Sequence, residues 1–118
     1  MGYCSDLRII LKKKDFEELK EKMNKYYKEK DCGYNLFNEE EYLLIIEQNE
    51  NWVKFGFNGL KWYKQYEDVG MIMNFITSRE EYHYMRLGEE YGDIETIDNL
   101  EYAEDCPEPS YAYHYIED

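Results

Sequence analysis

Two spacings of hydrophobic residues divide the first hundred positions into strands and helices. In residues 6–11, Leu7, Ile9 and Leu11 are two positions apart, so their side chains share one face of an extended chain. This alternation predicts a first strand. A run of lysines follows it and marks its end.

A helix is expected next, because apolar residues then recur every three or four positions. Asp15, with Glu18 three residues later, has the spacing of a helix N-cap and its capping-box partner. Phe16 and Leu19 begin an apolar stripe, while lysines occupy the other positions. The pattern predicts an amphipathic helix from Asp15 to about Lys30.

Two apolar runs separated by a polar stretch predict a β-hairpin. The runs are residues 42–46 and 52–57, and the sequence QNEN lies between them. Asn58 and Gly59 then form a dipeptide typical of a tight turn. After that turn, residues 60–64 are expected to return as extended chain or as a second turn.

A second helix and further strands are predicted from the next segments. Glu67 and Asp68 are acids where a helix N-terminus favours negative charge. Residues 82–87 alternate as a strand, and residues 93–97 fit a short edge strand. The apolar positions that give the second helix its period are Val69, Ile72, Met73 and Ile76.

The order strand, helix, strand, strand, helix, strand predicts an α+β domain with the split β-α-β-β-α-β pattern of ferredoxin-like folds. A chain of 118 residues is long enough for one hydrophobic core. We expect residues 1–100 to form a single compact domain and residues 101–118 to form an acidic, tyrosine-rich C-terminal extension. Tyr111, Tyr113 and Tyr115 alternate, which predicts either one more strand or a segment that docks on the domain.

Charge is distributed unevenly along the chain. The formal net charge is −13, and residues 87–118 contain eleven acids and no Lys or Arg. The other 86 residues contain 16 acids and 14 bases, so they are nearly neutral. Because so much negative charge repels phosphate backbones and anionic lipid surfaces, direct binding to nucleic acid or membrane is disfavoured. A basic protein partner is favoured instead.

The N-terminal residues and the cysteines predict a cytoplasmic location. The start lacks a basic region followed by an apolar core and a cleavage site, and no apolar run is long enough for a membrane span. Cys4, Cys32 and Cys106 are widely and irregularly spaced, without a C-x-x-C pair. We therefore expect reduced thiols with a mostly structural role.

No catalytic constellation is evident, and we expect the chain not to be an enzyme. It contains no nucleophile elbow, P-loop, dinucleotide-binding glycine motif or H-E-x-x-H motif. His83 is expected to be a half-exposed strand residue. Cys106 and His114 are close in sequence, but nothing supplies an orienting third group or an oxyanion hole.

We expect no cofactor and no dedicated metal site. Carboxylates around residues 93–98 miss the spacing of a calcium-binding loop, although nonspecific binding of divalent cations stays open. The tetrapeptide KFGF at residues 54–57 partly resembles the base-stacking signature of RNA-binding domains. Its phenylalanines are more simply explained as core and cross-strand packing.

The acids of the C-terminal third, interleaved with tyrosines, form the candidate interaction surface. On an extended segment, Asp93 and Glu95 would place their side chains about 6.6 Å apart on the same face. Such carboxylates and aromatic rings imitate phosphates and bases, and they complement a groove lined with Lys and Arg. A solvated tail that only aids solubility is the alternative. The predicted partner-binding residues are Glu89, Glu90, Tyr91, Asp93, Glu95, Asp98, Glu101, Tyr102, Glu104 and Asp105.

Three segments resemble small acidic uncharacterised proteins carried by phages and prophages of AT-rich Gram-positive bacteria. They are MGYCSDLRIILKK at residues 1–13, LKWYKQYEDV at residues 60–69 and MRLGEEYGDIE at residues 85–95. The eleven Lys against three Arg, with eight Asn, agree with an AT-rich genome. In size and charge the chain is similar to anti-CRISPR and other anti-defence inhibitors of such phages.

The resemblance and the charge together predict a phage-encoded inhibitor. It would bind a basic, nucleic-acid-handling defence effector such as a CRISPR nuclease and block its DNA or RNA groove. A second hypothesis is a non-catalytic interaction module, or an oligomeric structural protein, that uses a tyrosine-rich sheet face. In that case Trp52, Trp62 and Tyr84 would carry contacts that are only weakly sensitive to salt.

Overall fold

The computed structural model describes residues 2–101 and 103–118 as a mixed α+β fold with one main antiparallel sheet. The strands of that sheet lie in the order β2-β3-β1-β4-β5. A short two-stranded sheet, β6-β7, follows near the C-terminus. The elements are β1 (Ser5–Lys12), α1 (Lys13–Lys30), β2 (Leu44–Gln48), β3 (Trp52–Leu60), α2 (Glu67–Thr77), β4 (Tyr82–Gly88), β5 (Ile94–Asp98), β6 (Tyr111–Ala112) and β7 (Ile116–Glu117).

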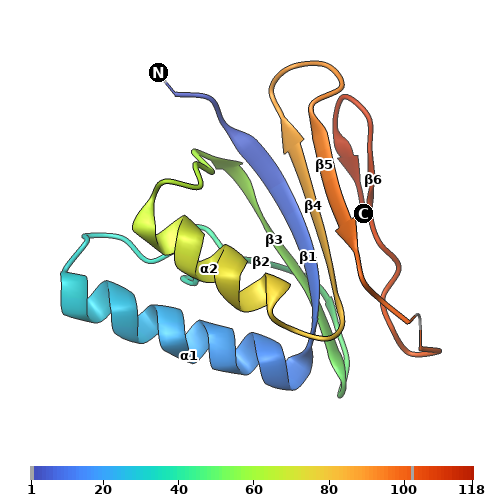
Figure 1. Cartoon of the computed structure of the whole chain (residues 1–118), viewed down its shortest axis with the longest axis horizontal. Coiled ribbons are helices and arrows are strands. Elements are labelled where there is room, and N and C mark those ends of the chain that lie inside the picture. Colours follow the sequence, from blue (N-terminus) through green and yellow to red (C-terminus); the bar gives the residue numbers. More distant parts are fainter. Residues whose placement is uncertain (1, 102) are drawn as a thin grey trace.

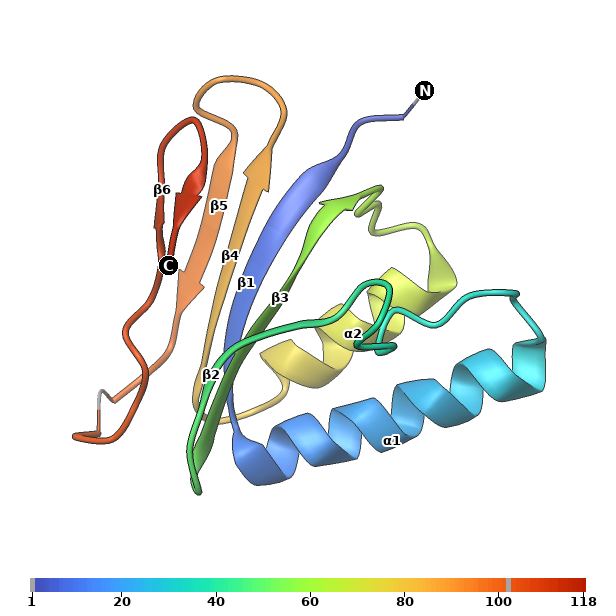
Figure 2. The ribbon, with the colours of Figure 1, turned by 180° about the vertical axis from the view of Figure 1, so that it is seen from behind.

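Three layers are visible when the sheet is viewed near its edge. Both helices lie on one side of the sheet, and the segment that carries β6 lies on the other (Figure 1). The reverse view shows the same arrangement (Figure 2). The α+β class predicted from the sequence is thereby confirmed. In the described part of the chain, no helix is long and apolar enough to cross a membrane.

The core lies between the sheet and the helices, and β1 occupies its centre. Leu7, Ile9 and Leu11 are fully buried, as their alternation predicts. Ile9 lies opposite Phe55 on one neighbouring strand and opposite Tyr84 on the other. The phenylalanines of the KFGF segment are thus core residues, in agreement with the packing interpretation.

The second face of the sheet is also buried, which the sequence did not predict. Arg8, Ile10, Lys54 and His83 alternate with the core residues and therefore point away from the helices. All four are nearly inaccessible to solvent. The C-terminal segment, residues 103–118, covers this face. One contact between them is the hydrogen bond that Lys54 Nζ donates to the carbonyl oxygen of Glu108 at 2.9 Å.

The predicted start of the first helix is wrong. The helix begins at Lys13 directly after β1, and its N-cap residue, Lys12, makes no side-chain capping bond. The Lys13 amide instead donates to the carbonyl oxygen of Asn51 at 2.8 Å, which satisfies one free N–H of the first turn. Asp15 lies within that first turn, 3.9 Å from a guanidinium nitrogen of Arg79.

The predicted turn at Asn58-Gly59 is also wrong, because β3 continues through it to Leu60. The pairing register between β1 and β3 shifts at this point, which marks a β-bulge. Gly59 adopts a φ of 67°, a left-handed conformation that glycine accepts readily. The Gly59 amide donates to Asp6 Oδ1 at 2.7 Å instead of pairing in the ladder.

The remaining elements agree with the sequence patterns apart from shifted ends. β2 and β3 form the predicted hairpin, although β2 starts two residues later than expected. β4 and the edge strand β5 pair as antiparallel neighbours.

Tyr111, Tyr113 and Tyr115 do not form one strand. They lie on the small β6-β7 hairpin, in a segment that docks on the sheet.

Candidate interaction surface

The charge asymmetry of the sequence becomes an asymmetry in space. We call residues 87–118 the acidic side of the molecule. Its β5 strand and C-terminal segment lie away from α1 (Figures 1 and 2). The α1 helix carries seven lysines and five acids, so the two sides differ in the sign of their charge. Such a distribution orients an approaching charged partner.

Arg86 holds two of the predicted partner-binding acids. Its two terminal nitrogens lie 2.9 and 3.1 Å from the carboxylate oxygens of Asp93, a bidentate pairing. Its Nε lies 3.4 Å from Glu95 Oε1. The Tyr3 hydroxyl donates to Asp93 at 2.6 Å, and the Tyr84 hydroxyl donates to Glu95 at 3.1 Å. Asp93 and Glu95 therefore lie on one side of the chain, as predicted for an extended segment. Their hydrogen bonds also connect this segment to β4 and to the N-terminal Tyr3.

These contacts lower the pKa values of both carboxyl groups. The hydrogen bond from Arg86, followed by the one from Tyr3, lowers the pKa of Asp93. Burial alone would raise the pKa of Glu95, but the Tyr84 hydroxyl and the charges of Lys64 and Arg86 outweigh it, and the pKa is lowered. Both residues remain ionised at neutral pH.

Asp105 is a third predicted site residue with a structural contact. Its carboxylate accepts hydrogen bonds from Asn51 Nδ2 at 2.6 Å and from Trp52 Nε1 at 3.2 Å. Its carbonyl oxygen accepts another from Asn49 Nδ2 at 2.7 Å. Asp105 thus attaches the C-terminal segment to the turn between β2 and β3.

The other predicted residues are more exposed. Glu89 accepts a hydrogen bond from the Cys4 amide at 2.9 Å, and Asp98 is exposed at the end of β5. Tyr91 is 85% exposed, and its ring lies 4.9 Å from that of His114. Tyr102 lies outside the residues that the structure describes. Exposed carboxylates of the acidic side are also contributed by Glu90, Glu101 and Glu104.

Sequence reasoning missed the basic residues beneath the C-terminal segment. Arg8 Nε lies 2.9 Å from Asp118 Oδ1, and Lys54 Nζ lies 4.0 Å from the same oxygen. Arg8 Nη1 also donates to Asn58 Oδ1 at 2.9 Å. A usable signal was present, because Arg8 and Lys54 are charged positions within otherwise apolar central strands.

Cys106 and His83, two of the residues considered for chemistry, lie in environments that disfavour their charged forms. Burial raises the pKa of the Cys106 thiol to about 11, and neighbouring acids such as Glu81 add to the rise, so little thiolate exists at neutral pH. His83 is buried, contrary to the half-exposed position predicted for it, because the C-terminal segment covers its face. Across residues 2–101 and 103–118, no group of three or more His, Cys, Asp or Glu side chains is placed to hold a metal ion.

The residues named for a tyrosine-rich sheet face are not on the surface. Trp52, Trp62 and Tyr84 are only 3%, 6% and 0% exposed, since both faces of the sheet are covered. The exposed tyrosines lie elsewhere. The most exposed are Tyr91 in the turn between β4 and β5, and Tyr111, Tyr113 and Tyr115 on the β6-β7 hairpin. Tyr34 in the loop after α1 and Tyr66 at the N-cap of α2 are exposed to a smaller extent, at 41% and 42%.

Comparison of the chain with protein-family models, with curated proteins and with solved structures finds no match.

Proposed function

We propose that the chain is a non-enzymatic inhibitor encoded by a phage or another mobile element and active in the host cytoplasm. It binds a basic, nucleic-acid-handling bacterial defence effector, such as a CRISPR nuclease. Its acidic side occupies the DNA or RNA groove of that effector. The observation that carries the proposal is the exposure of many carboxylates in residues 87–118, a stretch without Lys or Arg.

The rigid anchoring of this surface supports the proposal. Hydrogen bonds hold Asp93, Glu95 and Asp105 in place. The exposed acids Glu90, Glu101 and Glu104 lie in the segments next to these anchored residues. A preformed charged surface loses less conformational entropy on binding than a flexible tail does. The exposed tyrosines around it add the aromatic contact area that often dominates interface energetics.

We also assign the first six elements to a ferredoxin-like arrangement. The order β-α-β-β-α-β and the neighbours β2-β3-β1-β4, all antiparallel, support this assignment. β5 then extends the sheet beyond β4. The arrangement places the acidic side but does not by itself indicate a function.

A second candidate function is a non-catalytic interaction or self-association module. The observation in its favour is the set of exposed tyrosines on the β6-β7 hairpin and at Tyr91. Burial of these rings in an interface would be driven mainly by the hydrophobic effect, which salt does not screen. The two candidates therefore differ in the salt dependence of binding.

A pull-down from lysates of bacteria that carry defence systems tests the proposal. The tagged chain is washed in parallel at low and high salt, and captured proteins are identified by mass spectrometry. We expect a basic nuclease or its guide complex to elute at high salt, and excess DNA or RNA to compete for it. A partner that survives high salt and ignores nucleic acid, or self-association alone, would favour the second candidate.

Matched charge variants make this test specific to the acidic side. Glu90, Glu101 and Glu104 are changed together to Gln, and the control changes Glu17, Glu21 and Glu29 on α1 to Gln. All six residues are exposed, and each variant loses the same three charges. Capture should fall only in the first variant. Equal capture by both would refute the proposed surface.

A further inference from the structure

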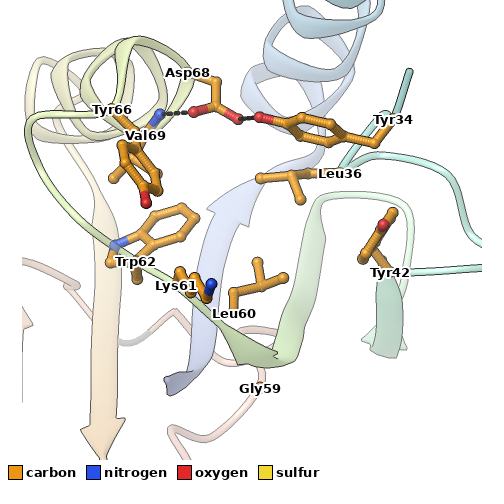
Figure 3. Close-up of a pocket in the computed structure, with 10 residues that line it drawn as sticks. All are labelled: Tyr34, Leu36, Tyr42, Gly59, Leu60, Lys61, Trp62, Tyr66, Asp68 and Val69. Carbon is orange, nitrogen blue, oxygen red and sulfur yellow. Dashed lines mark hydrogen bonds between the residues drawn. The ribbon is translucent and has the colours of Figure 1, made fainter. Parts of the chain in front are cut away.

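A small cavity lies between the N-terminus of α2, the end of β3 and the loop that follows α1. Its volume is about 250 Å³, below the roughly 300–1,000 Å³ of most ligand pockets, so it suits a small chemical group. Its walls are aromatic and aliphatic, and one wall carries the carboxylate of Asp68 (Figure 3). The apolar lining comprises Tyr34, Leu36, Tyr42, Leu60, Trp62 and Tyr66.

Asp68 is a buried carboxylate that accepts three hydrogen bonds. The side chain is 5% exposed, and its Oδ2 accepts hydrogen bonds from the hydroxyls of Tyr27 and Tyr34, each at 2.8 Å. Its Oδ1 accepts the Val69 amide at 2.9 Å. Burial, together with the hydrogen bond to Asp68, raises the pKa of Tyr34 above its ordinary value, so the hydroxyl remains a donor well above neutral pH. This donor set fits the ionised carboxylate.

Within residues 2–101 and 103–118, no basic side chain forms an ion pair with the carboxylate of Asp68. Buried charges are normally paired, because removing them from water is costly. The N-terminus of α2 offsets part of that cost through its dipole. A cation in the adjacent cavity would complete the compensation.

We propose that this cavity binds an alkylammonium group. The faces of Tyr and Trp rings attract cations, and their surface suits the alkyl substituents of an ammonium group. The indole nitrogen of Trp62 points away from the cavity, so the ring rather than a hydrogen-bond donor faces the ligand (Figure 3). This site is separate from the acidic side and does not depend on the function proposed above.

Titration of the full chain with choline chloride, followed by NMR signals of Trp62 and the tyrosine rings, tests the proposal. The matched ligand control is 3,3-dimethyl-1-butanol, a neutral molecule in which a carbon atom replaces the ammonium nitrogen of choline. We expect saturable shifts with choline and at least about tenfold weaker binding of dimethylbutanol. Equal affinities, or no saturable shift with any ammonium compound, would overturn the proposal.

Variants separate the charge of Asp68 from its role in folding. Asp68→Asn should weaken choline binding about tenfold, whereas Glu67→Gln, a neighbouring exposed acid, should not. Because Asp68→Asn also alters two tyrosine contacts, Lys61→Gln provides a second test. Lys61 is exposed and lines the cavity, so removing its charge should strengthen choline binding about twofold. Weaker binding in Lys61→Gln would contradict a cation site.

The ammonium group has two possible sources, a free amine or the lysine side chain of a protein. A parallel titration with N-acetyl-lysine amide distinguishes them. Tighter binding of that compound than of choline would identify a lysine side chain as the ligand. Tighter binding of choline would identify a free quaternary amine. Either result supports the site, because both ligands carry the ammonium group.

Discussion

Asp118 Oδ1 lies 2.9 Å from the Nε of Arg8, which joins the C-terminal segment to the central strand of the sheet across 110 positions. The same oxygen accepts the Ser110 hydroxyl at 2.6 Å. Lys54, the other buried base beneath the segment, is 4.0 Å away. These contacts hold the C-terminal segment over the second face of the sheet.

Loss of the Asp118 charge should loosen this segment. We expect Asp118→Asn to lower the free energy of unfolding by about 1–2 kcal/mol, because a buried Arg8 loses a charged hydrogen-bond partner. Urea unfolding measures this change. The Cys106 thiol should also react faster with an alkylating reagent, since its burial depends on the docked segment.

Glu117→Gln is the control for that variant. Glu117 is exposed, and its substitution removes the same charge one position earlier. It should change neither the unfolding free energy nor the rate of Cys106 alkylation. Equal effects of the two variants would mean that Asp118 does not hold the segment.

His83 should make stability depend on pH. Burial, to which the charge of Lys54 adds, lowers its pKa below the ordinary value, although Asp98 partly opposes this. Below about pH 6.5 the unfolded chain therefore binds more protons than the folded one, and stability falls as pH decreases. We expect His83→Gln to flatten this slope between neutral and mildly acidic pH, as measured by urea unfolding. His114→Gln, at an exposed position, should leave the slope unchanged.

Asp93 and Glu95 should prove important for folding. Changing both to Lys places two cations beside Arg86 and removes the acceptors of the Tyr3 and Tyr84 hydroxyls. We expect a lower melting temperature by circular dichroism. Reversal of Glu90 and Glu101 to Lys, at exposed positions, should leave the melting temperature nearly unchanged. An unchanged melting temperature in the first variant would mean that the Arg86 contacts contribute little.

Two glycines should respond in opposite directions to substitution by alanine. At Gly56, a Cβ atom would collide with the backbone oxygen of Leu7 and the side chain of Arg8, so Gly56→Ala should cost about 1–3 kcal/mol of stability. At Gly70, inside α2, a Cβ atom would meet its nearest neighbour, the Lys64 oxygen, at an ordinary 3.6 Å. Gly70→Ala should therefore stabilise by about 0.5–1 kcal/mol. Chemical unfolding of both variants tests these expectations.

The spacing of apolar residues was sufficient to identify a strand or helix where its core-facing residues repeat with a regular period. Leu7, Ile9 and Leu11 identified β1, and the stripe through Ile72 and Ile76 identified α2, because the residues that pack in the core between sheet and helices repeat with one regular period in each element. Element ends were less predictable. At the first helix, which begins at Lys13, the carbonyl oxygen of the distant Asn51 accepts a hydrogen bond from the Lys13 amide. The residues next to Lys13 contain no capping motif that would have predicted this contact.

The sequence by itself determined the α+β class, the order of the elements and the concentration of negative charge in the last third of the chain. Only the tertiary structure decided which of those acids hold the fold together. Asp93, Glu95 and Asp118 resemble their exposed neighbours in sequence, yet they contact Arg86 and Arg8. An ion pair depends on the distance between two side chains in space, and that distance is set by strand pairing and docking between segments far apart in the chain.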